Sequence, residues 1–329
     1  MKTIKLGLAA TTAFALTSGV AFADGHAKKW DMPLAYSASN FHSQNAAEFA
    51  ACVGAKSGGS LEIVTHPGGS LFKGGEIKRA IQTGQAPIGE RLLSAHANEN
   101  PVFGIDSVPF LATSFDDSVK LYGLAKAELE KALDEQNLQL LYSVPWPPQG
   151  LYFKKPVASV ADMKGLKFRA YNAATSRLAE LTGMQPTQIE AAEVQQAFST
   201  NAVESMVSSG ATGYDRKVFE AGVTHYYEVD AWLPRNSIMV NKDAYAGLDE
   251  GQKIALAFCA GAAEAAGLQK SKDYTQFTYD GLRAGGMTVE PASDGLKGEL
   301  QAVGATMTDE FLAAAGESGK AIVDAFKAE

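Results

Sequence analysis

An arginine at the end of a short strand is the residue of this chain best suited to bind an acid. Leu166 and Phe168 alternate with polar residues in Gly165-Leu-Lys-Phe-Arg169, and a polar loop follows at Ala170-Tyr-Asn172. A guanidinium is always charged, and its rigid fork of donors matches a carboxylate. At a strand end that faces a cleft, Arg169 would therefore capture an organic acid. The alternative from these residues alone is a structural salt bridge.

Other chemistry has little support in the sequence. The nucleophile elbow Gly-x-Ser-x-Gly, the dinucleotide fingerprint Gly-x-Gly-x-x-Gly and the zinc helix His-Glu-x-x-His do not occur. The five histidines lack metal-ligand spacing. The carboxylates Glu190 and Glu193 fall on a predicted solvated helix face, and Gly316-Glu-Ser-Gly-Lys320 is only a faint likeness of a phosphate loop. We therefore predict no catalytic site, no cofactor, no metal and no enzymatic activity.

The start of the chain has the three parts of a secretory signal peptide. Residues 1–5 are positively charged, residues 6–20 are apolar or small and uncharged, and Ala21-Phe-Ala23 is a small-x-small cleavage site. The apolar part is too short to span a bilayer comfortably, and no later run approaches ~20 apolar residues. We predict a signal peptide over residues 1–23 and a mature chain exported to the periplasm.

The charge of the chain limits its partners. The net charge is −8, and removal of a signal peptide would also take away Lys2 and Lys5. An acidic protein is a poor ligand for nucleic acid or an anionic membrane. A small anion is still a possible ligand, because one arginine in a low-dielectric cleft can outweigh a weak global field. About 300 mature residues indicate two domains, and we expect a monomer.

Cys52 and Cys259 are the only cysteines of the sequence. An oxidising periplasm would permit one disulfide, but nothing in the sequence brings the two residues together. Both lie in alanine-rich helical stretches. We therefore predict two buried, unpaired thiols, with pairing as the alternative.

Short apolar strands alternate with longer helical patterns along the mature chain. The predicted strands are 31–36, 61–65, 102–110, 138–144, 166–169 and 202–207. The predicted helices are 43–56, 76–83, 116–135, 174–182, 191–200 and a long helix over 248–279. This alternation predicts an α/β fold with largely parallel sheets, in which ligands bind outside the carboxyl ends of the strands.

Two proline-containing breaks interrupt this alternation and divide the chain. They are Trp146-Pro-Pro-Gln-Gly150 and Trp232-Leu-Pro-Arg-Asn236, neither of which can continue a helix or a regular strand. We predict two α/β lobes around a ligand cleft that closes by hinge motion. The predicted ranges are 24–146 with 235–274 for lobe I, and 147–234 with 275–329 for lobe II.

Several short segments follow one another in a characteristic order and spacing. They are Gly69-Ser-Leu-Phe-Lys-Gly-Gly-Glu-Ile77, Val108-Pro-Phe110, Ser159-Val-Ala-Asp-Met-Lys-Gly-Leu-Lys-Phe-Arg169, Glu193-Val-Gln-Gln-Ala-Phe198, Asn201-Ala-Val-Glu204, Lys217-Val-Phe-Glu220 and Val240-Asn-Lys242. Together they make the chain resemble the DctP-type substrate-binding proteins of tripartite ATP-independent periplasmic (TRAP) transporters over nearly the whole mature chain. The resemblance implies a two-lobed periplasmic binding protein fold with a long bridging helix. It also implies a ligand carboxylate held between the lobes and delivered to a TRAP membrane permease.

The resemblance places four binding positions on this chain. The signature arginine of the family falls on Arg169, and a family glutamate near the cleft falls on Glu90, whose alternative role is to hold Arg91 or a backbone group. Members that bind sialic acid carry a second arginine where this chain has Gln149. Ser208 stands where the family's Gln-Glu-Asn-Pro run has its asparagine. These two departures disfavour a sialic acid or a compact dicarboxylate.

Ring side chains accompany these altered polar positions. They are Tyr36, Phe41, His42, Trp146, Tyr171, Tyr214 and Trp232. The alternative for each is ordinary core packing. As a group they favour a flat acid, and we predict an aromatic monocarboxylate such as benzoate or hydroxybenzoate. A small 2-oxo or hydroxy acid is the competing ligand, and a periplasmic sensory protein that presents its ligand to a receptor is the competing role.

Overall fold

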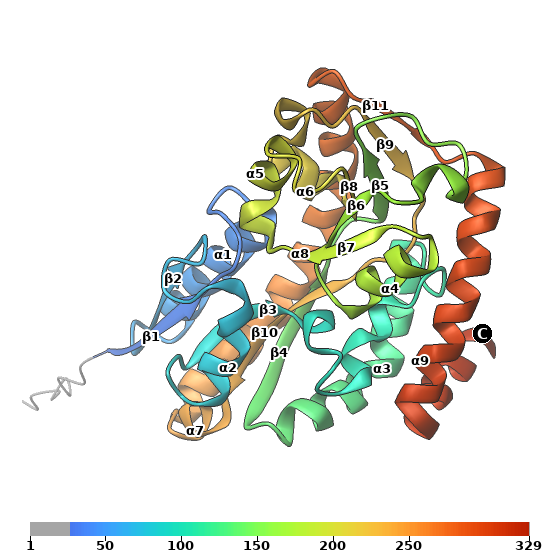
Figure 1. Ribbon diagram of the computed structural model, residues 1–329. Helices are drawn as coiled ribbons and strands as arrows, with labels where there is room; N and C mark the ends of the chain where they lie inside the picture. The colour runs from blue at the N-terminus through green and yellow to red at the C-terminus, as the bar shows by residue number, and fades with distance from the viewer. Residues whose placement is uncertain (1–26, 329) are drawn as a thin grey trace, which may run out of the picture.

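The computed structural model describes residues 27–328. The predicted signal peptide, residues 1–23, lies outside the described residues. The described residues form three sheets and the helices that cover them, arranged as two lobes (Figure 1). Within this part of the chain, no helix has the length and apolar character needed to cross a membrane.

Two small sheets form the first lobe. One pairs β1 (Lys28–Pro33) with β2 (Leu61–His66) in parallel, and the other has the antiparallel order β3 (Ile88–Leu92), β10 (Arg235–Asn241), β4 (Leu138–Pro145). The helices of this lobe are α1 (Phe41–Lys56), α2 (Ile77–Gln82), α3 (Phe115–Asp134) and α7 (Lys242–Ala246). Short 3₁₀ helices join them: η1 (Gly74–Glu76), η2 (Leu93–His96) and η3 (Pro101–Ser107).

One six-stranded sheet forms the second lobe. Its order is β11 (Thr288–Pro291), β9 (His225–Glu228), β5 (Gln149–Phe153), β8 (Ser205–Ser209), β6 (Lys167–Ala170), β7 (Gln185–Gln188). Its helices are α4 (Ala173–Leu181), α5 (Val194–Ser199) and α6 (Gly210–Asp215), with the 3₁₀ helices η4 (Val160–Met163), η5 (Ala191–Glu193) and η6 (Val218–Ala221).

The prediction of largely parallel sheets is wrong for two strands. β5 runs antiparallel to β8 and β9, and β10 runs antiparallel to β3 and β4. Parallel neighbours need a crossover connection within their own sheet. β5 and β10 instead enter directly from the other lobe, through residues 146–148 and 229–234. The chain thus crosses between the lobes at both predicted breaks.

Two further local predictions are corrected. Residues 102–110, predicted as a strand, overlap the 3₁₀ helix η3 (Pro101–Ser107). This helix begins with Pro101 after the cap Asn100, whose side chain accepts a hydrogen bond from the backbone of Val102. β3 was not predicted, although it is fully buried. Its charged residues Glu90 and Arg91 are inside the protein, so the apolar pattern of a buried strand is missing.

Two long helices connect the lobes. α8 (Glu250–Ala284) packs on α1 and β4 of the first lobe and on α6 and β11 of the second. Gly267 of α8 packs tightly on β4, since an added Cβ would lie 2.4 Å from Val144 Cγ2. α9 (Asp294–Ala328) lies along one side of the molecule against α4 and α3 (Figure 1) and is interrupted at Gly316, whose φ of 62° and ψ of −150° are not helical. Ile322 and Val323, beyond this interruption, join the core of the first lobe. The predicted lobe boundaries remain a proposal.

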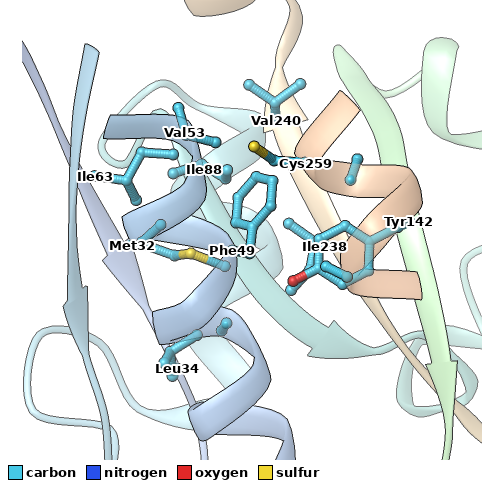
Figure 2. Close-up of a cluster of buried hydrophobic side chains, with 14 of the residues drawn as sticks. Met32, Leu34, Phe49, Val53, Ile63, Ile88, Tyr142, Ile238, Val240 and Cys259 are labelled. Carbon is cyan, nitrogen blue, oxygen red and sulfur yellow. The ribbon is translucent and has the colours of Figure 1, made fainter. Parts of the chain in front are cut away.

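A disulfide joins α1 to α8. Cys52 and Cys259 are bonded, with their Cα atoms 5.8 Å apart and a separation of 207 positions in sequence. The prediction of two unpaired thiols is therefore wrong, because only the side-by-side packing of α1 and α8 brings the cysteines together. Figure 2 shows Cys259 inside the apolar core of the first lobe, which also contains Phe49 of α1 and Tyr142 of β4.

Candidate functional site

A small cavity lies between the two lobes. It has a volume of about 40 Å³, and contacts between the lobes, such as the ion pair of Arg91 and Glu190, hold the lobes closed over it. Both lobes contribute to its wall. The lining residues are Tyr36, Arg91, Leu92, Trp146, Gln149, Arg169, Tyr171, Glu190, Ala191, Ser208, Ser209, Thr212 and Pro234.

Arg169 extends from β6 into this cavity and is 3% exposed. Its Nε donates to the backbone oxygen of Ile189 at 2.8 Å, and its guanidinium carbon lies 5.0 Å from the centre of the Tyr171 ring. Burial lowers the pKa of Arg169 to about 10. Among the described residues, no carboxylate forms a salt bridge with it. A buried cation without a counter-ion is costly, so the site favours an anionic ligand.

Three ring and amide side chains form a hydrogen-bonded row beside Arg169. Trp232 Nε1 donates to the hydroxyl of Tyr171 at 3.0 Å, and that hydroxyl donates to Gln149 Oε1 at 3.1 Å. Gln149 Nε2 donates to the backbone oxygen of Pro147 at 3.0 Å. Tyr171 and Gln149 therefore reach the cavity in fixed orientations, while Trp232 supports them from behind.

Another part of the cavity wall is aromatic. Trp146 and Tyr36 line the cavity with their ring centres 4.8 Å apart. Phe41 and His42 lie behind Trp146, at 5.4 and 4.3 Å between ring centres, and do not line the cavity. Burial, followed by the charge of Arg235, holds the pKa of His42 well below its usual range. Phe41 and His42 thus support the wall and make no lining contact.

Tyr214 lies away from the cavity. Its ring packs edge-on against Phe277 at 5.3 Å, and it fills the space beside Gly281, where an added Cβ would lie 2.3 Å from Tyr214 Cε2. Ser208, in contrast, lines the cavity at the end of β8. The cavity therefore brings together six of the predicted site residues, namely Tyr36, Trp146, Gln149, Arg169, Tyr171 and Ser208.

Glu90 acts on the cavity through a neighbour. It is 2% exposed and does not line the cavity, and its Oε1 accepts a hydrogen bond from Asn236 Nδ2. Asn236 Oδ1 in turn accepts from Trp146 Nε1 at 2.8 Å. Glu90 therefore holds the wall tryptophan in place through Asn236.

Glu90 is expected to make the stability of the protein depend on pH. Burial raises its pKa from 4.5 to about 7, so between these values the folded state binds more protons than the unfolded state. The free energy of unfolding then falls as pH rises through this window, by roughly 2–3 kcal/mol. We expect Glu90→Gln to melt at a higher temperature than the native protein at pH 8 and at a similar temperature at pH 4.5.

The control for this measurement is the exposed Glu193→Gln. The pKa of Asp106 is also raised to about 7 by burial, so Asp106 contributes to the fall of stability with rising pH in every variant. If the difference in melting temperature between Glu90→Gln and the native protein is the same at pH 4.5 and at pH 8, Glu90 does not cause the pH dependence of stability.

Sequence reasoning missed the ion pair that closes the cavity. Arg91 Nη2 lies 3.1 Å from Glu190 Oε1, which joins β3 of the first lobe to the loop after β7 of the second. Glu190 was predicted on a solvated helix face; its side chain is 46% exposed but also lines the cavity. The sequence offered no clear signal for it, because β7, the strand before Glu190, is polar and its parallel pairing with β6 appears only in the structure.

Hydroxyl groups complete the lining. Ser209 Oγ is buried with no hydrogen-bond partner among the described residues, and Thr212 follows it in α6. Elsewhere, hydrogen bonds from Asn40 Nδ2 to Asp215 (2.8 Å) and from Asn172 Nδ2 to Ser94 (3.1 Å) also join the lobes. Among residues 27–328, no cluster of three His, Cys, Asp or Glu side chains could hold a metal ion.

Two lobes closed over a buried arginine define a solute-binding receptor fold. Residues 34–314 match the family model "Bacterial extracellular solute-binding protein, family 7", called DctP. The chain belongs to this family. The family consists of receptors of TRAP transporters, so the chain is a binding protein and not an enzyme.

Solved structures and curated proteins agree with this assignment. A TRAP solute-binding protein from a marine metagenome, specific for pyroglutamate, is 53% identical, has a TM-score of 0.90, and matches 92% of this chain and 99% of its own. DctP6 of Bordetella pertussis, which binds pyroglutamic acid, is 44% identical with a TM-score of 0.90 over 92% and 100% of the two chains. The ectoine/5-hydroxyectoine-binding protein UehA of Ruegeria pomeroyi is 24% identical over 99% of this chain and 97% of that protein.

Proposed function

We propose that this receptor captures pyroglutamate in the periplasm, as a monomer, and delivers it to a TRAP permease. Pyroglutamate is a five-membered cyclic amide that carries one carboxylate. The observation that carries the proposal is Arg169, a buried guanidinium at a closed cavity with no carboxylate partner among the described residues. A ligand carboxylate would supply the missing charge and accept the paired N–H groups of the fork.

The ligand is supported by relatives of substantial identity. Structures that are 53%, 44% and 42% identical to this chain, the last being DctP7 of Bordetella pertussis, bind pyroglutamate. The aromatic monocarboxylate expected from the ring residues finds no support in these relatives. Trp146 and Tyr36, whose ring planes lie 67° apart, give the cavity an apolar wall that can contact a lactam ring as well as an aromatic one.

Capture follows from the closure of the lobes. In an open form water would reach Arg169, and a ligand favours closure only through contacts that are stronger in the closed form. Closure removes water and strengthens the pairing of guanidinium and carboxylate. Release then requires a partner that favours the open form, and we propose the permease for this role.

We expect the protein, purified from the periplasm without unfolding, to carry pyroglutamate that mass spectrometry detects after denaturation. After unfolding, dialysis and refolding, calorimetry should show 1:1 binding of pyroglutamate. Lactate and 4-hydroxybenzoate should bind at least roughly 100-fold more weakly, because they lack the lactam N–H and carbonyl. Tighter binding of 4-hydroxybenzoate than of pyroglutamate would contradict the proposed ligand.

A further inference from the structure

The ion pair of Arg91 and Glu190 lies where the two lobes meet at the cavity. Glu190 Oε1 lies 3.1 Å from Arg91 Nη2, and Oε2 lies 3.5 Å from Nη1. The Arg91 side chain is 6% exposed and that of Glu190 is 46% exposed, and both residues line the cavity. The carboxylate is therefore oriented by a buried partner from the opposite lobe and reaches both the cavity and its mouth.

The backbone on both sides of this pair is also fixed. Ile189, directly before Glu190, donates from its backbone N–H to Ala170 at 3.0 Å and accepts from Arg169 Nε at 2.8 Å. On the other lobe, Gly74 packs against the pair, and an added Cβ would lie 3.0 Å from Arg91 Nη1 and 3.1 Å from Glu190 Oε2. The expected carboxylate anchor thus also holds the backbone from which Glu190 extends.

The hydrogen-bonding capacity of the lining makes Glu190 distinctive. Arg91 and Arg169 can only donate, and Gln149 Oε1 already accepts from Tyr171. Glu190 is the one carboxylate among the lining residues, and a carboxylate can only accept. Two guanidiniums and one carboxylate leave one positive charge, which suits a ligand with one carboxylate.

We propose that Glu190 accepts the ring N–H of the ligand and so selects a cyclic amide acid over an equally shaped lactone acid and over dicarboxylates. This inference rests on the proposed function, because it assigns the second polar contact of the same ligand. A lactone acid places a ring oxygen where the lactam has its N–H, so two acceptors would face each other. A second ligand carboxylate would meet the charge of Glu190 in the same way.

The selectivity can be measured by calorimetry with two ligands of one shape. These are pyroglutamate and freshly dissolved 5-oxotetrahydrofuran-2-carboxylate, in which oxygen replaces the ring N–H. The native protein should bind the lactam about tenfold more tightly than the lactone. This factor corresponds to the weaker end of the range for hydrogen bonds to charged groups, because water competes for the partly exposed carboxylate of Glu190. In Glu190→Gln the preference should fall below about threefold, since an amide can also donate to the ring oxygen.

The matched control is Glu193→Gln, an equal charge change three residues away at an exposed side chain that does not line the cavity. Glu193→Gln should keep the native preference for the lactam over the lactone. Glutarate, a dicarboxylate, should bind Glu190→Gln more tightly than it binds the native protein or Glu193→Gln. Tight binding of pyroglutamate with an unchanged lactam preference in Glu190→Gln would overturn this inference and leave the proposed function intact. Failure of the native protein to bind pyroglutamate would overturn both.

Discussion

Arg169→Ala is expected to weaken ligand binding by at least roughly 100-fold, equivalent to ~3 kcal/mol. The guanidinium is buried at the closed cavity and no described carboxylate pairs with it, so in the complex the ligand would be its counter-ion. Its removal leaves the ligand carboxylate desolvated without a partner. Isothermal calorimetry of the ligand-free protein with pyroglutamate measures the loss.

The fold should survive this substitution. Arg169 gives up one hydrogen bond to Ile189, which costs about 1 kcal/mol, while relief of a buried charge offsets part of that cost. The melting temperature without ligand should therefore change by only a few degrees. Arg177→Ala, at an exposed arginine that pairs with Glu180 and Glu310, is the matched control and should bind normally. If Arg169→Ala binds pyroglutamate with the affinity of the native protein, Arg169 does not bind the ligand.

The Cys52–Cys259 disulfide is expected to supply the largest single contribution to stability that the structure shows. It links α1 to α8 across 207 residues of sequence, a stretch that includes the six-stranded sheet apart from β11. In the chain-entropy account, closing a loop of this length restricts the unfolded state by ~5 kcal/mol, and native disulfides generally give 2–5 kcal/mol. The double variant Cys52→Ser/Cys259→Ser should therefore melt roughly 3–8 °C lower.

A reductant separates this effect from changes in packing. Dithiothreitol should lower the melting temperature of the native protein toward that of the double serine variant and leave the variant itself unchanged. Free thiols detected in the unfolded native protein without reductant would show that the bond does not form. A shift below about 1 °C in the variant would show that the bond contributes little stability.

Much of the fold follows from local sequence patterns. The long helix predicted over 248–279 is α8, and the strand predicted around Phe168 is β6. Both could be predicted because the spacing of apolar residues is a local property of the sequence. The breaks after Trp146 and Trp232 were visible from their prolines. β3 was missed because its polar side chains find buried partners that lie far away in the sequence, such as Asn236 for Glu90.

The candidate site residues likewise fall into those that the sequence could indicate and those that only the structure could place. Arg169 could be singled out from its chemistry and its place at a strand end, while the family resemblance pointed to Gln149 and Ser208. Phe41 and Tyr214 were named for their ring type, but ring type does not distinguish a cavity wall from a core. Only the packed structure decided that Phe41 supports Trp146 and that Tyr214 packs on α8.

The sequence by itself determined the class of protein and pointed to Arg169 as the proposed carboxylate anchor. A signal-like start, alternating elements, two breaks and ordered motifs are all local or near-local features. Tertiary structure alone decided the disulfide, the role of Glu90 behind Trp146 and the pairing of Arg91 with Glu190. Each of these depends on residues about 90 to 210 positions apart in the chain. Packing of α8 on α1 brings the cysteines together, pairing of β10 with β3 and β4 places Asn236 between Glu90 and Trp146, and closure of the two lobes joins Arg91 to Glu190.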